Sequence, residues 1–211
     1  SDVSITATRT DSSRLTGDAK KAIGSRPAFD LRVNYGRGKQ VQSFGAGSVS
    51  VTIPYALGVN EKAGNVQAVY VDGSGKVQWL ISSVYDSLNR VLRFSTNHFS
   101  TYGVGYKQDA PAFTDIDSHW AKDDMGFVVN RGLFSGTSKT TFSPNTAMTR
   151  GMFVTALGRL ANADVSAYAK SSFSDVKSDA YYMGYIEWAS KNSIVTGIGD
   201  GKFAPDQSIT R

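Results

Sequence analysis

The 211-residue sequence contains no cysteine and only two histidines, His98 and His119. The lack of cysteine excludes a disulfide scaffold, a thiolate zinc site and a cysteine nucleophile. Two histidines leave little for metal binding or triad chemistry, so we predict a protein without metal, cofactor or catalytic site. No apolar run approaches the ~18 residues that a membrane span needs, so we predict no membrane span.

Positive charge is concentrated in the first half of the chain. Residues 1–110 contain 13 Lys and Arg against 8 Asp and Glu, whereas residues 111–211 contain ten of each. The excess favours anionic partners such as a wall polymer or a lipid headgroup, although a solvated basic face is the commoner cause of such a pattern. No nucleic-acid-binding motif accompanies the charge, so we predict no nucleic-acid partner.

Short alternating segments separated by turns indicate β-structure in residues 1–108. Val49, Val51 and Ile53 alternate with polar residues, which is typical of a half-buried strand. Residues 66–71 and 76–82 flank an Asp-Gly-Ser-Gly turn and predict a hairpin. Further strands are predicted at 29–33, 90–96 and 101–107, with one short helix at 11–23 that stops at Gly24. The pattern predicts an antiparallel β-sandwich, followed by a linker at residues 109–112.

Helical periodicity replaces this pattern after the linker. Ser118 is predicted to cap a helix that ends at Arg131, with Trp120, Phe127 and Val128 on its apolar face. Two more helices are predicted, one capped by Thr149 with an apolar stripe of Met152, Phe153, Ala156, Leu157 and Leu160, and one at 179–191 with Tyr182, Ile186 and Ala189 on one face.

An internal repeat is the strongest signal in the sequence. Residues 113–116 (FTDI) recur as 173–176 (FSDV), and from there an offset of 61 aligns Gly136 with Gly197 and Thr149-Arg150 with Thr210-Arg211. Repetition at this period indicates stacked units that share a core. We place a first repeat at 113–172 and a second, incomplete repeat at 173–211, which gives an α+β, multidomain fold.

The motifs FTDI…HWA…NRGLFSG…TFSPNTAMTR and their second copy resemble the S-layer homology module of bacterial cell-surface proteins. The resemblance implies a pseudo-threefold bundle of three repeats. It also implies grooves that bind an anionic, often pyruvylated, secondary cell-wall polysaccharide. It further implies a secreted protein of the cell wall or S-layer of a Gram-positive-type bacterium. The family's helix opening usually reads Thr-Arg-Ala-Glu, whereas here Gly151 and Met152 replace the last two residues, which costs helix propensity and a capping box.

Arg150 lies at a predicted helix start, where a cation is unfavourable and an anion is favoured. We therefore expect Arg150→Gln to be neutral or slightly favourable for stability. We expect Arg150 to face either a ligand carboxylate or phosphate, or Asp115 or Asp175. Trp120 could stack on a sugar or pack in a core. Together with the resemblance, these patterns give as candidate polymer-binding residues Arg150, Arg211, Trp120, Asp115, Asp175, Gly136 and Gly197.

The predicted function is binding: non-covalent anchoring of a secreted protein to the cell wall. The alternative is an accessory fragment of a secreted glycan-degrading enzyme, with the β-sandwich as a carbohydrate-binding or adhesive module. Because the second repeat lacks its closing helix, we expect its apolar stripe to be covered by the sandwich, by a second chain or by an exchanged repeat. Self-association through this repeat is therefore one predicted partner interaction.

Overall fold

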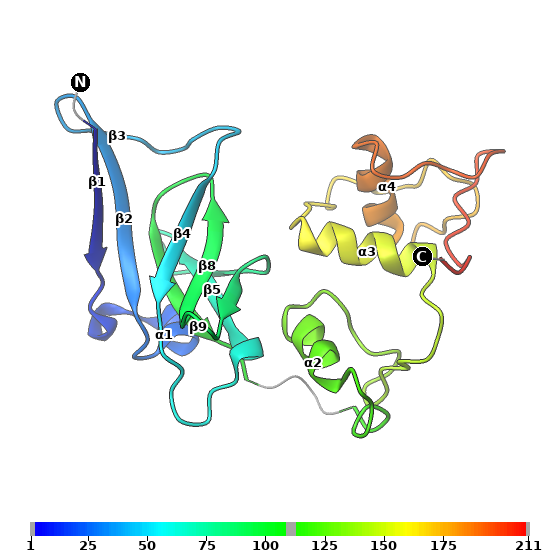
Figure 1. Cartoon of the computed structure of the whole chain (residues 1–211). Coiled ribbons are helices and arrows are strands. Elements are labelled where there is room, and N and C mark those ends of the chain that lie inside the picture. Colours follow the sequence, from blue (N-terminus) through cyan, green and yellow to red (C-terminus); the bar gives the residue numbers. More distant parts are fainter. Residues whose placement is uncertain (1–2, 109–112, 210–211) are drawn as a thin grey trace. The chain divides into compact units, whose positions relative to one another are not determined.

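The computed structural model describes residues 3–108 and 113–209 of the chain. The chain divides into two compact units, unit 1 (residues 1–109) and unit 2 (residues 110–211), whose elements are labelled in Figure 1. The predicted linker at 109–112 lies outside the described residues, as does Arg211.

Unit 1 contains two antiparallel sheets. The larger has the order β1–β2–β9–β5–β6, with β3 also paired to β2, and the smaller has the order β4–β8–β7. The strands are β1 (Val3–Arg9), β2 (Ala28–Tyr35), β3 (Lys39–Gln40), β4 (Val49–Pro54), β5 (Val66–Val71), β6 (Val77–Leu80), β7 (Val84–Asp86), β8 (Val91–Thr96) and β9 (Thr101–Tyr106). All the predicted strands are present with ends shifted by at most two residues, whereas β1, β3 and β7 were not predicted.

The larger hydrophobic cluster of unit 1 contains residues from both sheets. Leu92 and Phe94 of β8 alternate with exposed residues, as expected for a strand with one buried face. Tyr102 of β9 is buried in this core, and its hydroxyl lies 2.6 Å from the hydroxyl of Thr96. The core residues are Leu31, Val33, Ile53, Val66, Ala68, Leu92, Phe94, Phe99, Tyr102 and Val104.

Helix α1 (Gly17–Ile23) packs on the larger sheet through a second cluster that includes Ala19, Ile23 and Val69. A Cβ atom on Gly103 would lie 2.7 Å from Ile23 Cδ1, so the close approach of helix and sheet requires glycine there. The helix predicted over 11–23 was too long. Residues 12–14 form a separate 3-10 turn, η1 (Ser12–Arg14), and the helix begins only at Gly17. Gly24 ends it with a φ of 60°, as predicted.

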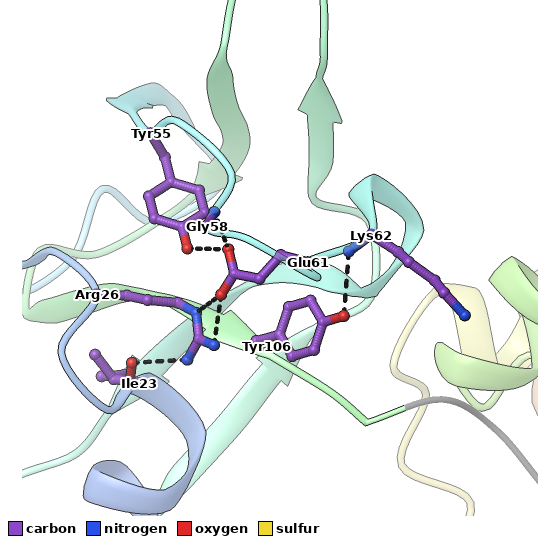
Figure 2. A network of polar contacts seen from close by, with 7 residues as sticks. All are labelled: Ile23, Arg26, Tyr55, Gly58, Glu61, Lys62 and Tyr106. Atoms are coloured by element: carbon purple, nitrogen blue, oxygen red, sulfur yellow. Dashed lines mark hydrogen bonds and ion pairs between the residues drawn. The ribbon is translucent and has the colours of Figure 1, made fainter.

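A network of polar side chains holds the loop after β4 against α1 and β9 (Figure 2). Arg26 donates to the Glu61 carboxylate at 2.7 Å and to the carbonyl of Ile23 at 3.0 Å, and the Tyr55 hydroxyl also donates to Glu61. Burial, together with the hydrogen bond to Glu61, raises the pKa of Tyr55 to about 12. Burial alone would raise the pKa of Glu61, but hydrogen bonds from Tyr55, Gly58 and Arg26 outweigh it and lower the pKa. The 3-10 turn η2 (Ala63–Asn65) follows this loop.

Unit 2 contains three helices among its described residues: α2 (Lys122–Asn130), α3 (Arg150–Leu160) and α4 (Met183–Lys191). Thr149 caps α3 as predicted, since its Oγ1 accepts the Met152 N–H at 3.3 Å. The prediction that Ser118 caps α2 was wrong. The ring of His119 instead accepts the Ala121 N–H at 3.2 Å, and the helix begins only at Lys122. The predicted apolar face of α2 was also wrong, because Met125 is the buried apolar residue and Phe127 is exposed.

Helix α3 packs against α4 through small residues. Its buried face consists of Gly151, Val154, Thr155 and Gly158, whereas Phe153 and Leu160 of the predicted stripe are exposed. Cβ atoms on Gly151 and Gly158 would lie 2.8 Å from Tyr182 and 2.3 Å from Tyr185. The stripe prediction failed because it counted large apolar residues, whereas the two tyrosines of repeat 2 fill the space that the glycines leave.

The expectation that the sandwich, a second chain or an exchanged repeat covers the apolar stripe of repeat 2 was also wrong, because a helix of the same unit covers it. Ile186 and Ala189 of α4 are fully buried in a cluster with Val154 of α3 and Phe203. Helix α3, which lies within the predicted first repeat (113–172), therefore packs on repeat 2. Repeat 1 has the smaller cluster, in which Phe113, Ile116 and Met125 are the buried apolar residues.

Candidate functional site

Both repeats contain the same loop, organised by an aspartate. Asp115 accepts the N–H groups of Phe142 and Ser143, and Asp175 accepts those of Phe203 and Ala204, at 2.7 to 3.1 Å. Ser143 and Ala204 have positive φ values of 63° and 58°, which turn both N–H groups toward one carboxylate. Asp115 and Asp175, which were predicted to bind the polymer, therefore have carboxylates that accept backbone N–H groups of their own repeat.

These hydrogen bonds change the acidity of both groups. The N–H groups of Phe142 and Ser143 lower the pKa of Asp115. Burial alone would raise the pKa of Asp175, but the N–H groups of Phe203 and Ala204 outweigh it and lower the pKa. Both carboxylates are therefore charged at neutral pH and fix the loops that follow the helices.

Gly136 and Gly197 occupy matching positions in these loops. A Cβ atom on Gly136 would lie 2.4 Å from the ring of Phe113, and one on Gly197 would lie 2.8 Å from the ring of Phe173. Both positions therefore exclude any side chain, and the first phenylalanine of each repeat packs against the loop backbone.

Arg150 connects α3 to the loop of repeat 2. Its Nε donates to the carbonyl of Phe203 and its Nη2 to the carbonyl of Thr196, both at 3.0 Å, and its guanidinium lies 4.4 Å from the centre of the Phe203 ring. Neither Asp115 nor Asp175 is its partner in these contacts. The side chain makes two charge-assisted hydrogen bonds, so we now expect Arg150→Gln to destabilise unit 2, against the prediction from the sequence.

The start of α3 does not offer the free backbone donors that its sequence suggested. The N–H of Arg150 donates to the carbonyl of Gln207 at 2.9 Å, and the N–H of Gly151 donates to that of Pro205 at 2.8 Å. Thr149 takes the N–H of Met152. These contacts leave the first turn of the helix bound to repeat 2 and unavailable as an anion site.

Trp120 and its counterpart Tyr181 are both on the surface. Trp120 is 88% exposed and stacks on the ring of His119, while Tyr181 is 60% exposed. Burial raises the pKa of Tyr181, and the positive charge of Arg159 opposes this shift. Trp120 is therefore available to a ligand and does not pack in a core.

An open pocket of about 760 Å³ lies between the loop of repeat 1 and the last turn of α3. Two cationic residues, Lys139 and Arg159, line it, and Arg159 also donates to the carbonyl of Leu133 at 3.2 Å. Its remaining lining combines apolar side chains with small polar ones: Phe113, Val129, Gly132, Phe134, Ser135, Gly136 and Ser138. No acidic residue is among these, so the pocket suits a negatively charged ligand.

Nothing in the local sequence singles out Lys139 or Arg159. A cation in the last turn of a helix, such as Arg159, is stabilising and therefore ordinary. The two residues are 20 positions apart and come together only because α3 turns back past the loop of repeat 1. Of the predicted site residues, Gly136 is the one that lines this pocket.

Within the described ranges 3–108 and 113–209, no cluster of three or more His, Asp or Glu side chains could hold a metal ion. No helix in those ranges is both long and apolar enough to cross a membrane.

Residues 112–151 and 172–211 match the S-layer homology domain. The chain therefore carries two S-layer homology domains, which together cover less than half of its length, and S-layer proteins of the bacterial cell surface are among its relatives. S-layer homology domains are binding domains without catalytic function, and they attach S-layer proteins and glycan-degrading enzymes to the cell wall. The resemblance to S-layer homology domains that the sequence predicted is thereby confirmed.

Glycan-degrading enzymes and S-layer proteins are both among the proteins similar to this chain. An amylopullulanase of Thermoanaerobacterium thermosulfurigenes is 34% identical over 171 residues, which are 79% of this chain and 9% of the relative. Endo-1,4-beta-xylanase A of Thermoanaerobacterium saccharolyticum is 40% identical, and S-layer protein sap of Bacillus anthracis 30% identical, each over 100 residues and 47% of this chain. The chain spans about a tenth of the length of these relatives. No solved structure matches it significantly.

The amylopullulanase match reaches beyond the two repeats. It covers 79% of the chain, whereas unit 2 contains less than half of it, so the similarity extends into unit 1. Units of both kinds therefore occur together in that relative.

Proposed function

We propose that this chain attaches a larger secreted protein to a Gram-positive-type cell wall, without a covalent bond, by binding an anionic secondary cell-wall polysaccharide. In this proposal unit 1 is a β-sandwich module, and the helical repeats of unit 2 bind the polymer. The pocket between repeat 1 and α3 carries the proposal, because Lys139 and Arg159 line it without an acidic residue among its lining.

The pocket supplies the groups that recognise a charged sugar. A guanidinium binds a carboxylate or phosphate through two parallel hydrogen bonds, and Arg159 has donors beyond the one that it gives to Leu133. Ser135 and Ser138 offer hydroxyl groups for sugar hydroxyls, and Phe134 offers an apolar surface. An anionic repeat unit, such as a pyruvylated sugar, meets these requirements.

The residues predicted from the sequence take two roles in this proposal. Trp120, Arg150 and Arg211 are proposed polymer contacts. Trp120 would act through its exposed ring, and Arg150 through guanidinium N–H groups other than the two that it gives to Phe203 and Thr196. Asp115, Asp175, Gly136 and Gly197 are proposed to act by shaping the two loops, as their hydrogen bonds and close packing support.

The proposal is tested with purified wall sacculi, before and after the secondary polymer is stripped. We expect binding to intact sacculi that is lost after stripping and weakened by salt. Arg159→Gln and Lys139→Gln should each reduce affinity about tenfold or more, since a charge-assisted contact contributes ~1.5–3 kcal/mol. Lys170→Gln, at an exposed position outside the pocket, is the matched control. Equal binding to stripped sacculi would refute the proposal.

A second function is supported by the match to the amylopullulanase, which extends into unit 1. In this alternative the chain is an accessory part of a secreted glycan-degrading enzyme, and unit 1 is a carbohydrate-binding or adhesive module. Binding of the chain to insoluble starch or xylan, unaffected by Arg159→Gln, would favour it. Retention on sacculi alone would favour the wall-anchoring function.

A further inference from the structure

The first strand of unit 1 has an exposed apolar face. By the register with β2, Ile5 lies opposite Val33 and Ala7 opposite Leu31, both of which are core residues. Paired residues of neighbouring strands point to the same side of a sheet, so Ile5 and Ala7 continue the core face. The smaller sheet does not cover them: Val3 is 64% exposed and Ile5 is 70% exposed.

The backbone of the same residues is open to pairing. Leu31 donates its N–H to Ser100 and Val33 accepts from Val41, so both turn their backbone groups away from β1. Residues opposite each other in an antiparallel ladder alternate between bonded and non-bonded pairs. Ile5 and Ala7 therefore belong to non-bonded pairs with β2, and their N–H and C=O groups point outward from the sheet edge. Figure 1 shows β1 at this edge, with β2 as its neighbour.

Proteins usually protect an edge strand of this length with a charge, a proline or a bulge. Residues 3–8 contain no charged residue and no proline. The β1–β2 register runs without interruption from Val3 to Arg9, so it contains no bulge. The edge therefore retains the ability to add a strand.

We propose that β1 pairs antiparallel with β1 of a second copy of this chain, with Ile5 opposite Ile5 of the partner subunit. In this register Val3 lies opposite the partner's Ala7, and the outward backbone groups of both strands meet as bonded pairs. The apolar strips of the two copies then form one continuous surface on the same face of a joined sheet. The proposal concerns unit 1 and does not depend on polymer binding.

In this register the apolar residues of β1 meet apolar residues, its polar residues meet polar ones and no two like charges meet, which favours a second copy as the occupant. The two Arg9 side chains lie eight residues apart along the joined strands, about 27 Å, which exceeds the ~8 Å screening length at physiological ionic strength. A shift of two positions along the partner would instead place Arg9 opposite Val3. On the other face Ser4 and Thr6 of one copy meet Thr6 and Ser4 of the other, which is a favourable cross-strand pair.

The association should be weak and reversible. A strand pair of this length buries less than the ~800 Å² per partner that is typical of stable complexes. We therefore expect a dimer that forms as the protein concentration rises.

Single cysteines test the register, because the chain has none of its own. A bonded antiparallel pair has Cα atoms ~5.5 Å apart, within the ~4.4–6.8 Å range of a disulfide. Under mild oxidation, Ile5→Cys should form a covalent dimer at least tenfold faster than Val3→Cys. Val3 is a matched control, since it is similarly exposed but would lie ~14 Å from Val3 of the partner subunit. Equal rates would overturn the proposed register.

A lysine variant tests whether the edge causes the association. Sedimentation equilibrium should show that Ile5→Lys abolishes dimer formation, while Ser95→Lys, on the exposed face of the middle strand of the smaller sheet, leaves it unchanged. A wild-type chain that stays monomeric up to millimolar concentration would overturn the proposal. So would hydrogen exchange that shows the amides of Ile5 and Ala7 protected in a monomeric longer protein, which would assign the edge to a preceding segment.

Discussion

Replacing Gly158 with alanine should destabilise unit 2, against the usual effect of such a change in a helix. Alanine is favoured over glycine in a helix interior by ~0.5–1 kcal/mol. At Gly158, however, the new Cβ atom would lie 2.3 Å from Cδ1 and 3.1 Å from Cε1 of Tyr185. Forcing extra volume into a packed interface typically costs ~1–3 kcal/mol, so we expect a net loss of ~0.5–2 kcal/mol.

Gly126 of α2 provides the matched control. Nothing lies within 4 Å of a Cβ atom built there, so Gly126→Ala should raise the free energy of unfolding of the unit by the full ~0.5–1 kcal/mol by which a helix favours alanine over glycine. For a unit of about 100 residues, 1 kcal/mol shifts the melting temperature by ~4–8 °C, which differential scanning calorimetry resolves. The two glycine variants should therefore melt on opposite sides of the wild type.

A second substitution isolates the cause. In a Tyr185→Ala background the clash is removed, and Gly158→Ala should become stabilising. A Gly158→Ala variant of the otherwise native chain that melts as high as Gly126→Ala would refute the close packing of α3 on Tyr185.

Three further changes test other parts of the structure. Arg150→Gln should lower the melting temperature of unit 2, because it removes two hydrogen bonds to backbone carbonyls and the contact with the Phe203 ring; Arg150→Lys should restore only part of the loss. Asp175→Asn should reduce the loss of unfolding free energy that occurs as the pH is lowered. Folding lowers the pKa of the Asp175 carboxyl, so the stability that the carboxylate contributes is present above pH ~4 and disappears as the pH falls through the folded pKa. Ultraviolet titration should find the Tyr55 hydroxyl ionising near pH 12, because burial and Glu61 raise its pKa. The stability that the protonated hydroxyl contributes is present below pH ~10 and is lost as the pH rises through the folded pKa. Glu61→Gln should shift this ionisation toward pH 10.

The sequence predicted those features that depend on neighbouring residues. The strands of unit 1 followed from alternation, and the cap of α3 followed from Thr149. The repeat followed from its 61-residue offset. Predictions failed where a contact that the pattern does not show decides the outcome, whether its partner is adjacent in the sequence or distant. Ser118 does not cap α2 because the ring of His119 accepts the Ala121 N–H there. The apolar stripe of α3 was misplaced because the tyrosines of repeat 2 pack against the glycines of the helix and not against its large apolar side chains.

The candidate site shows the same division. Asp115, Gly136 and their counterparts were identifiable because they recur, but their contacts with loop backbone were not visible in the sequence. Lys139 and Arg159 carry no local signal, since each is an ordinary surface cation until the fold brings it to the pocket. Arg150 was recognised as unusual at a helix start, and its partners turned out to be carbonyl groups of the other repeat.

The placement of α3 has a consequence for how such chains are divided and recombined. The sequence duplication would set a boundary between residues 151 and 172, but Val154 packs with Ile186 and Phe203 across that boundary. A fragment that starts at residue 172 would expose Ile186, and a fragment that ends at 171 would carry α3 without its tyrosines. The segment that is copied as a unit therefore differs from the segment that folds as a unit. A chimaera that exchanges repeats should join donor and host before Thr149, so that α3 travels with the repeat on which it packs.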